Sequence, residues 1–241
     1  YKSHNFGANK ICDIPVNLGV RHYSGHIYYM WDAAENYWSG HEWGTTDPWQ
    51  PTVAFVSNSG YPKSKTDGGA RWYHEGDGPF EASVNPLFKQ LPNANEMAWY
   101  ALRGDAHWDN TTQWEAFGIT YTGGIWLKKL SVIAQESGWE LAALKLKDPN
   151  NIDLCASFRS YSVSVKNGKP ADSEIGKYFF LPALSYYYVG RFGHFGSDGN
   201  CWSSSANPDD SSTAYSICFD SHLVNMLASA RRFGFVVQPF E

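Results

Sequence analysis

One segment near the C-terminus limits the fold more than any other, because bulky apolar residues alternate strictly with small or polar ones. In residues 214–220, Tyr215, Ile217 and Phe219 alternate with serine, cysteine and aspartate. Side chains on a β-strand point alternately to opposite faces, so this segment predicts a strand with one bulky face and one mixed face. A shift of one residue would bury Asp220 and expose Phe219, and the register is therefore well specified.

Two segments before Trp139 carry helical patterns. The first is 92–104, where Pro92 and Asn93 stand at the start and Gly104 is a suitable C-cap. Its expected inner residues are Met97, Ala98, Ala101 and Leu102. The second is 123–138, which ends at Gly138. Its expected inner residues are Ile125, Leu127, Leu130, Ile133 and Ala134.

Short strands and long loops are expected elsewhere. Residues 1–90 place aromatic residues between turn-forming segments, such as those at 67–69 and 76–79. After Trp139, β patterns run at 142–148, 155–165 and 177–184. The sequence therefore predicts an α+β fold with two helices, short antiparallel strands and a high loop content, in a single domain of residues 1–241.

Composition excludes two classes of partner. The net charge is −5 and the charged residues are interspersed, so no basic stripe is available for nucleic acid. No segment approaches the roughly 20 apolar residues that a membrane helix needs, and no membrane insertion is expected. The four cysteines (Cys12, Cys155, Cys201 and Cys218) lack metal-type spacing and do not specify a compartment.

Several segments partly match catalytic or metal-binding motifs, but each lacks an essential residue. The His-Glu pairs at 41–42 and 74–75 lack the second histidine of H-E-x-x-H. Ser197 lacks the glycine two residues before it that a nucleophile elbow requires. The glycines at 190, 193, 196 and 199 predict repeated backbone turns and match no phosphate-binding loop. Asp209 and Asp210 favour a turn, with a structural calcium ion as the alternative.

Three segments in order carry a more specific pattern: 91–104, 177–190 and 196–240. The last contains a signature of Trp-Ser-Ser after a glycine, an Ala-Tyr strand, Val-Asn, and an arginine followed by Gly-Phe-x-Val. The signature residues are Gly199, Trp202, Ser203, Ser204, Ala214, Tyr215, Val224, Asn225, Arg231, Gly234, Phe235 and Val237. The chain resembles the variable proteins of diversity-generating retroelements, of the Bacteroidales and phage type, whose fold is C-type-lectin-like (formylglycine-generating-enzyme-like). Residues 1–90 match only weakly.

The resemblance implies a non-enzymatic ligand-binding protein, a receptor-binding protein or adhesin, whose variable region is 186–241. Diversification at template adenines, chiefly in Asn and Tyr codons, does not produce Lys, Glu, Gln, Met or Trp. The expected ligand-binding residues all fall within the permitted types: Arg191, Phe192, His194, Phe195, Cys201, Ser216, Cys218, Asp220, His222, Leu223, Leu227, Ala228, Ser229, Ala230, Arg232 and Phe233. The excluded types Trp202, Met226 and Gln238 fall between them.

The resemblance also implies a setting and a local structure. The protein would be extracellular, on a cell surface or a phage tail, with an unknown protein or glycoconjugate ligand on a cell surface, and monomer and trimer both stay open. Trp202 is expected to be buried scaffold, and Cys201 and Cys218 to be free thiols on the variable face. Residues 222–230 also have helical spacing, but we predict an irregular loop there, followed by a strand over 235–238.

Two other functions stay as alternatives. A formylglycine-generating-type oxidase shares the fold and uses a reactive cysteine pair, for which Cys201 and Cys218 are the candidates, although the expected R-G-G-S-W-like segment is absent. A calcium-dependent sugar-binding lectin would need an E-P-N or Q-P-D loop, which is also absent. Residues 108–110 match the lectin's partner motif only loosely. No catalytic residue, cofactor or metal site is predicted.

Overall fold

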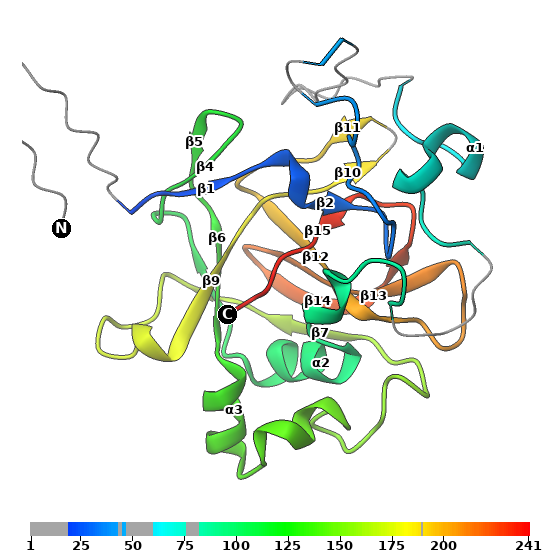
Figure 1. The fold of residues 1–241 in the computed structure, drawn as a ribbon. Helices are drawn as coiled ribbons and strands as arrows, with labels where there is room; N and C mark the ends of the chain where they lie inside the picture. Colours follow the sequence, from blue (N-terminus) through cyan, green and yellow to red (C-terminus); the bar gives the residue numbers. More distant parts are fainter. Residues whose placement is uncertain (1–18, 43–44, 47–59, 76–81, 189) are drawn as a thin grey trace, which may run out of the picture.

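The largest element is a six-stranded sheet built mainly from the C-terminal part of the chain (Figure 1). The computed structural model describes residues 19–42, 45–46, 60–75, 82–188 and 190–241, so Cys12 and the predicted turn at 76–79 lie outside the described residues. The strand order is β2-β15-β12-β13-β14-β7. The bounds are β2 (Tyr28–Tyr29), β7 (Tyr161–Ser164), β12 (Asp198–Ala206), β13 (Thr213–Asp220), β14 (Leu223–Ala230) and β15 (Phe235–Val236).

Three smaller sheets complete the β structure of the described residues. A four-stranded sheet has the order β8-β3-β6-β9, a three-stranded sheet has β1-β4-β5, and β10 pairs with β11. The bounds are β1 (Arg21–Tyr23), β3 (His107–Asp109), β4 (Trp114–Ala116), β5 (Ile119–Tyr121), β6 (Gly124–Lys128), β8 (Lys166–Asn167), β9 (Tyr178–Pro182), β10 (Tyr187–Tyr188) and β11 (Arg191–Phe192). The pairs β1–β4, β3–β8 and β12–β15 are parallel, so the sheets are mixed rather than antiparallel throughout.

The helix α2 (Ala94–Arg103) confirms the first helix prediction. Asn93 accepts a hydrogen bond from the backbone of Glu96, and the Glu96 carboxylate accepts one from the backbone of Asn93, which forms a capping box. Met97, Ala98 and Ala101 are buried as expected. The helix packs against β7, β13 and β14 and so covers the core side of the large sheet (Figure 1).

The second helix is shorter than predicted. Residues 124–128 form β6, and only α3 (Leu130–Ser137) is helical, ending at Gly138 with φ +69° as expected for a C-cap. Ile125 and Leu127 are two residues apart and both are fully buried, so the spacing in this part is that of a strand. The apolar run begins with the spacing of a strand and continues with that of a helix. The predicted helix therefore started too early in the sequence.

Other element predictions have mixed outcomes. The strand over 177–184 is confirmed as β9, and 155–165 contains only the short β7. The strand predicted at 142–148 is wrong: Leu141–Lys145 is a 3-10 helix, and the side-chain amides of Asn93 and Asn95 donate to the carbonyl of Lys145. The third helix, α1 (Lys65–Gly68), was not expected and begins where Ser64 accepts from the backbone of Asp67. The fold is nevertheless α+β, as predicted. None of the described helices is long and apolar enough to cross a bilayer.

Aromatic residues fill the core on both sides of the six-stranded sheet. The main core contains Tyr215, Ile217 and Phe219 together with residues of α2, β6 and β9. A satellite cluster on the opposite side contains Trp202 and Phe235, whose rings stack at 4.4 Å between centroids. Trp202 is fully buried, as expected for scaffold, and its indole N–H donates to the carbonyl of Tyr29. The two clusters fix the sheet from both faces.

Candidate ligand-binding face

Alternation along β13 and β14 separates a core face from an open face. Residues directly paired across strands share a face, and β13 pairs with β14 over seven residues. Ile217 pairs with Met226, and Phe219 pairs with Val224; all four are at most 2% exposed. The core face of β13 therefore contains the residues that its sequence predicts.

The open face lies on the other side of the same strands. We define it as the exposed or partly exposed residues of β13, β14 and β7 that point away from the core. They are Ser162, Ser164, Cys218, Asp220, Leu223, Asn225 and Leu227. Ser216 and Ser229 also point to this side, but they are buried and their hydroxyl oxygens lie 2.8 Å apart. The accessible surface therefore begins beyond this serine pair.

The loop predicted over 222–230 is wrong, and so is the helical alternative. Residues 223–230 form β14, a central strand that pairs with β13 on one side and β7 on the other. The tight turn that precedes it is held by Asp220, whose carboxylate accepts from the backbone N–H groups of His222 and Leu223 at 2.6 and 2.9 Å. The apolar residues at helical spacing are divided between the two faces of a strand. Asp220 thus has a structural role as well as an exposed position.

Three predicted ligand-binding residues lie on the wrong face for that role. Cys201 pairs with Ile217, Ala228 with Tyr215 and Ala230 with Thr213, so all three point to the core side of the sheet. Cys201 is 3% exposed and cannot contact a ligand. The sequence did not reveal this because the relevant alternation in β12 depends on its pairing register with β13.

The two cysteines of the large sheet do not meet. Cys201 points to the core and Cys218 to the open face, and both thiols are free. Burial raises the pKa of Cys218 to about 11, although hydrogen bonds with Ser216 and Ser229 oppose the shift. Burial, and secondarily the neighbouring Cys218, raises the pKa of Cys201 well above its usual range. Both sulfurs are therefore weak nucleophiles near neutral pH.

The glycine-rich segment places its aromatic residues in the core rather than on the open face. Phe192 is 1% exposed, and its ring stacks on that of Phe195 at 4.2 Å within the main core. Arg191 and His194 are exposed. Gly190 and Gly196 have φ of +72° and +78°, so the predicted turns are confirmed at these two positions. Phe192 and Phe195, which were expected to bind the ligand, therefore pack in the main core instead.

An aromatic corner adjoins the open face where β14 ends. We define it as Tyr186, Tyr188 and Phe233 with the two arginines Arg191 and Arg232. The rings of Tyr188 and Phe233 meet edge to face at 5.0 Å, and Phe233 lies 5.8 Å from Tyr186. Arg191 is the cross-strand partner of Tyr188 in the β10–β11 pair. The corner brings together exposed residues that are far apart in sequence.

Sequence reasoning missed Tyr186 and Tyr188. They belong to a run of three tyrosines, of which Tyr187 is fully buried in the main core. Alternation places the two flanking tyrosines on the opposite side, next to the satellite cluster and the corner. The run of three tyrosines was a usable sequence signal, because alternation along a strand places its outer two members on the same face.

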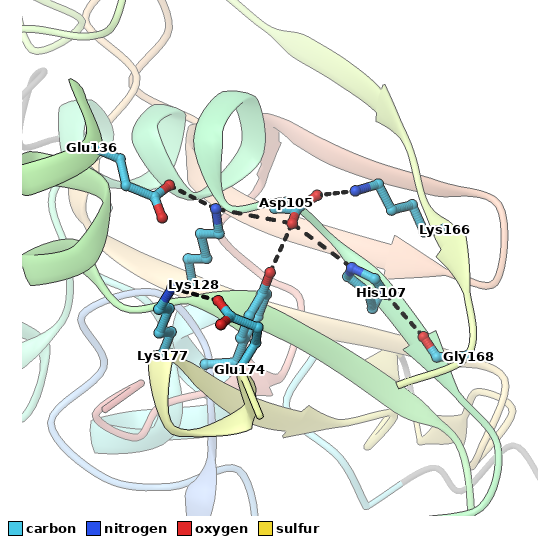
Figure 2. A network of polar contacts seen from close by, with 9 residues as sticks. Asp105, His107, Lys128, Glu136, Lys166, Gly168, Glu174 and Lys177 are labelled. Carbon is cyan, nitrogen blue, oxygen red and sulfur yellow. Dashed lines mark hydrogen bonds and ion pairs between the residues drawn. The ribbon is translucent and has the colours of Figure 1, made fainter. Parts of the chain in front are cut away.

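A polar cluster also lies on the four-stranded sheet (Figure 2). Asp105 accepts hydrogen bonds from Lys166 and, at 2.7 Å, from Tyr178. His107 and Lys128 lie within 4.0 Å of the same carboxylate, and Lys128 also contacts Glu136 at 2.6 Å. Partial burial alone would raise the pKa of Asp105, but these hydrogen bonds outweigh it and lower the pKa.

This network connects several elements of the fold. Its members come from β3, β6, β8 and β9 and from α3, and each charge faces an opposite charge (Figure 2). The His107 ring also contacts the carbonyl of Gly168 at 3.0 Å. We interpret the cluster as a structural network that holds the strands of the four-stranded sheet together.

Asp210, one of the two residues considered for calcium, and Asp109, from the segment that loosely matches the lectin motif, both accept internal hydrogen bonds. The Asp210 carboxylate accepts from the backbone N–H and hydroxyl of Ser212, which confirms a turn at 207–212. The Asp109 carboxylate accepts from Thr111, Thr112 and Trp126. Within the described ranges, no group of three or more His, Cys, Asp or Glu side chains is placed to hold a metal ion. Comparisons with protein-family models, with curated proteins and with solved structures gave no match to this chain.

Proposed function

We propose that this chain is a non-enzymatic ligand-binding protein, a receptor-binding protein or adhesin of the retroelement-diversified type with a C-type-lectin-like fold. The open face and the aromatic corner form its ligand-binding surface. The observation that carries the proposal is the division of β13 and β14 into two faces. The central core-face residues Ile217, Phe219, Val224 and Met226 are buried, whereas the opposite face is mixed and partly accessible. The protein would be displayed outside the cell, on a cell surface or a phage tail.

A surface that varies needs a backbone that does not depend on the varying side chains. β13 is hydrogen-bonded on both sides, to β12 and to β14, and β14 is bonded to β13 and β7. The ladders therefore fix the backbone of β13 and β14 without help from most side chains of the open face. Asp220, whose carboxylate holds the turn between the two strands, is an exception. Loops would lack the support of the ladders, and a strand face is accordingly a suitable place for variation.

The distribution of residue types supports the proposal. Cys218, Asp220, Leu223 and Leu227 are among the positions that the resemblance expects to vary, and all lie on the open face. Met226, a type that adenine diversification does not produce, is fully buried on the core face. Trp202, another such type, is fully buried in the satellite cluster.

Two observations favour binding over the oxidase and lectin alternatives. Cys201 and Cys218 lie on opposite faces of the sheet, so the cysteine pair that an oxidase of this type requires is not assembled. Asp109 lies in the segment that loosely matches the lectin motif, and its carboxylate already accepts hydrogen bonds from Thr111, Thr112 and Trp126. The open face offers hydroxyl, amide and aliphatic groups, which suit recognition better than catalysis.

The test needs DNA from the locus that encodes the chain. We expect a near-identical template repeat beside a reverse-transcriptase gene, differing from codons 186–233 only at template adenines. The differing codons should include those of Cys218, Leu223 and Leu227, whereas the codons of Trp202 and Met226 should be identical. Differences spread over all four bases, or concentrated in core-face codons, would contradict the proposal.

A further inference from the structure

Two consecutive arginines at the end of β14 have opposite environments. Arg231 is 1% exposed, its Nε donates to the carbonyl of Thr213 at 3.0 Å, and its guanidinium lies 4.5 Å from the Trp31 ring centroid. Arg232 is exposed, and within the described part of the chain it forms neither an ion pair nor a hydrogen bond through its side chain. One arginine is therefore built into the scaffold and the other is available to a ligand.

The available arginine is held in place by aromatic rings. The Arg232 guanidinium lies 5.7 Å from the Tyr188 ring centroid and 5.9 Å from that of Phe233. Phe233 in turn stacks on Phe235 at 5.5 Å, and Phe235 stacks on the buried Trp202. Stacking restricts the guanidinium before any ligand arrives, so less conformational entropy is lost on binding.

The charge around Tyr188 is positive. Arg191 is exposed beside it as its cross-strand partner, and Arg191, like Arg232, has no ion-pair partner among the described residues. The one carboxylate on the open face, Asp220, is used by the backbone of the turn. A planar guanidinium presents two parallel N–H donors that match a carboxylate. The complementary group on a ligand is thus a carboxylate.

The open face indicates the kind of molecule that carries this carboxylate. Leu223 is 38% exposed and Leu227 is partly exposed on the open face. Apolar side chains of a polypeptide would cover these branched leucines, whereas sugar hydroxyls would leave them without apolar contacts. Tyrosine and arginine are also the residues that most often dominate protein interfaces.

We propose that the ligand is a protein segment with an aspartate or glutamate among apolar residues, and that its carboxylate binds between Arg191 and Arg232 against Tyr188. The apolar residues of the segment cover Leu223 and Leu227. This inference rests on the proposed function of the open face. It adds the chemical class of the ligand and names the residues that anchor it.

The test is selection of a random dodecapeptide library, displayed on phage, against the immobilised full chain. Enriched peptides should share an acidic residue next to apolar ones. Arg232→Gln should weaken their binding by about ten- to hundredfold, because a charge-assisted bidentate contact is lost. Arg232→Lys should bind the peptides more weakly than the wild type but more tightly than Arg232→Gln, since lysine keeps the charge but loses the planar guanidinium. Arg191→Gln should weaken binding as well, and equal thermal midpoints would show that each variant is folded.

The matched control is Arg103→Gln, an exposed arginine at the end of α2, which should leave peptide binding unchanged. Enriched peptides without acidic residues, no enrichment at all, or a glycan-array signal that depends on Arg232 would each overturn the inference. Peptides that depend on Leu223 but not on either arginine would overturn the anchor and leave the open face as the binding surface. The template-repeat test uses no ligand, so the two proposals fail separately.

Discussion

The two faces of the β13–β14 pair share one backbone, yet their side chains meet different physical demands. On the core face, Ile217 and Phe219 are at most 2% exposed and pack in the main core. On the open face, Leu223 is 38% exposed and Asp220 closes a turn. Alternation along a strand thus lets a protein change its surface chemistry while its stability is set by the intervening residues.

The side of the six-stranded sheet that carries the open face is not equally accessible from one edge to the other. Around β12 and β15 it is covered by the satellite cluster with Trp202 and Phe235, and only beyond the buried Ser216–Ser229 pair is it accessible. Pointing away from the main core is therefore not enough to make a residue available to a ligand. The contrast between a buried face and an accessible face therefore applies only to β14, β7 and the part of β13 at Cys218 and Asp220.

The largest expected effect comes from the core face. Phe219→Ala should lower the free energy of unfolding by about 3–5 kcal/mol, because it removes a fully buried ring and leaves a cavity. Its neighbour Cys218→Ala, on the other face, should cost less than about 1 kcal/mol. Urea denaturation followed by tryptophan fluorescence measures both. Equal losses at 218 and 219 would mean that the two faces are not distinct.

A close contact between β12 and β13 gives the next largest effect. A Cβ added at Gly199 would stand 2.1 Å from Cζ of the buried Phe219 ring. Gly199→Ala should therefore cost about 1–3 kcal/mol of stability through overpacking. Gly176→Ala is the matched control, because nothing lies within 4 Å of its added Cβ. Partial recovery in the double variant with Phe219→Leu would assign the loss to this contact, and no recovery would count against it.

Disruption of the Asp105 network on the four-stranded sheet should have a smaller, pH-dependent effect on stability. Asp105→Asn removes a carboxylate that Lys166 and Tyr178 bind, and should cost about 1–2 kcal/mol at neutral pH. Asparagine tolerates the positive φ of +47° at this position, so the backbone is not strained by the change. Loss of charge and hydrogen bonding is then the main cause.

The pH dependence follows from the lowered pKa of Asp105. A carboxyl group whose folded-state pKa is depressed stabilises the protein above its unfolded pKa of about 3.9, and this stabilisation is lost as pH falls through the folded value. The stability difference between wild type and Asp105→Asn should thus be constant from neutral pH to about pH 5 and shrink below about pH 4. A difference that grows on acidification would refute the role of the charge.

The sequence predicted the elements whose signals are local. The α2 helix has its own capping residues, and β13 has its own alternation, so both elements were found. Their predicted inner residues are buried except Leu102 of α2, which is partly exposed. By contrast, β14 could not be found from its own residues, since leucines and alanines at helical spacing compete with its alternation. It is a strand because β13 and β7 pair with it, which is long-range information.

The site was predictable to the same degree. Leu223 and Leu227 are exposed or partly exposed on the open face, whereas Cys201, Ala228 and Ala230 face the other way. Which face a residue occupies depends on register, and register in β12 is set by pairing with β13 and interrupted by a shift between Trp202 and Ala206. Tyr188 and Arg232 meet only in the folded chain, and no sequence spacing connects them.

The smallest expected effect is the sharpest test of the two faces, because it compares adjacent residues. Leu223→Asn should change the free energy of unfolding by no more than about 0.5 kcal/mol, since the side chain is already substantially exposed. Val224→Asn places an amide where Val224 is now 0% exposed on the core face, and should cost several-fold more. Both substitutions introduce the same side chain into the same strand, so strand propensity cancels in the comparison. If the two urea midpoints agree, the open face is part of the folding core, and it is then unsuited to carry a variable surface.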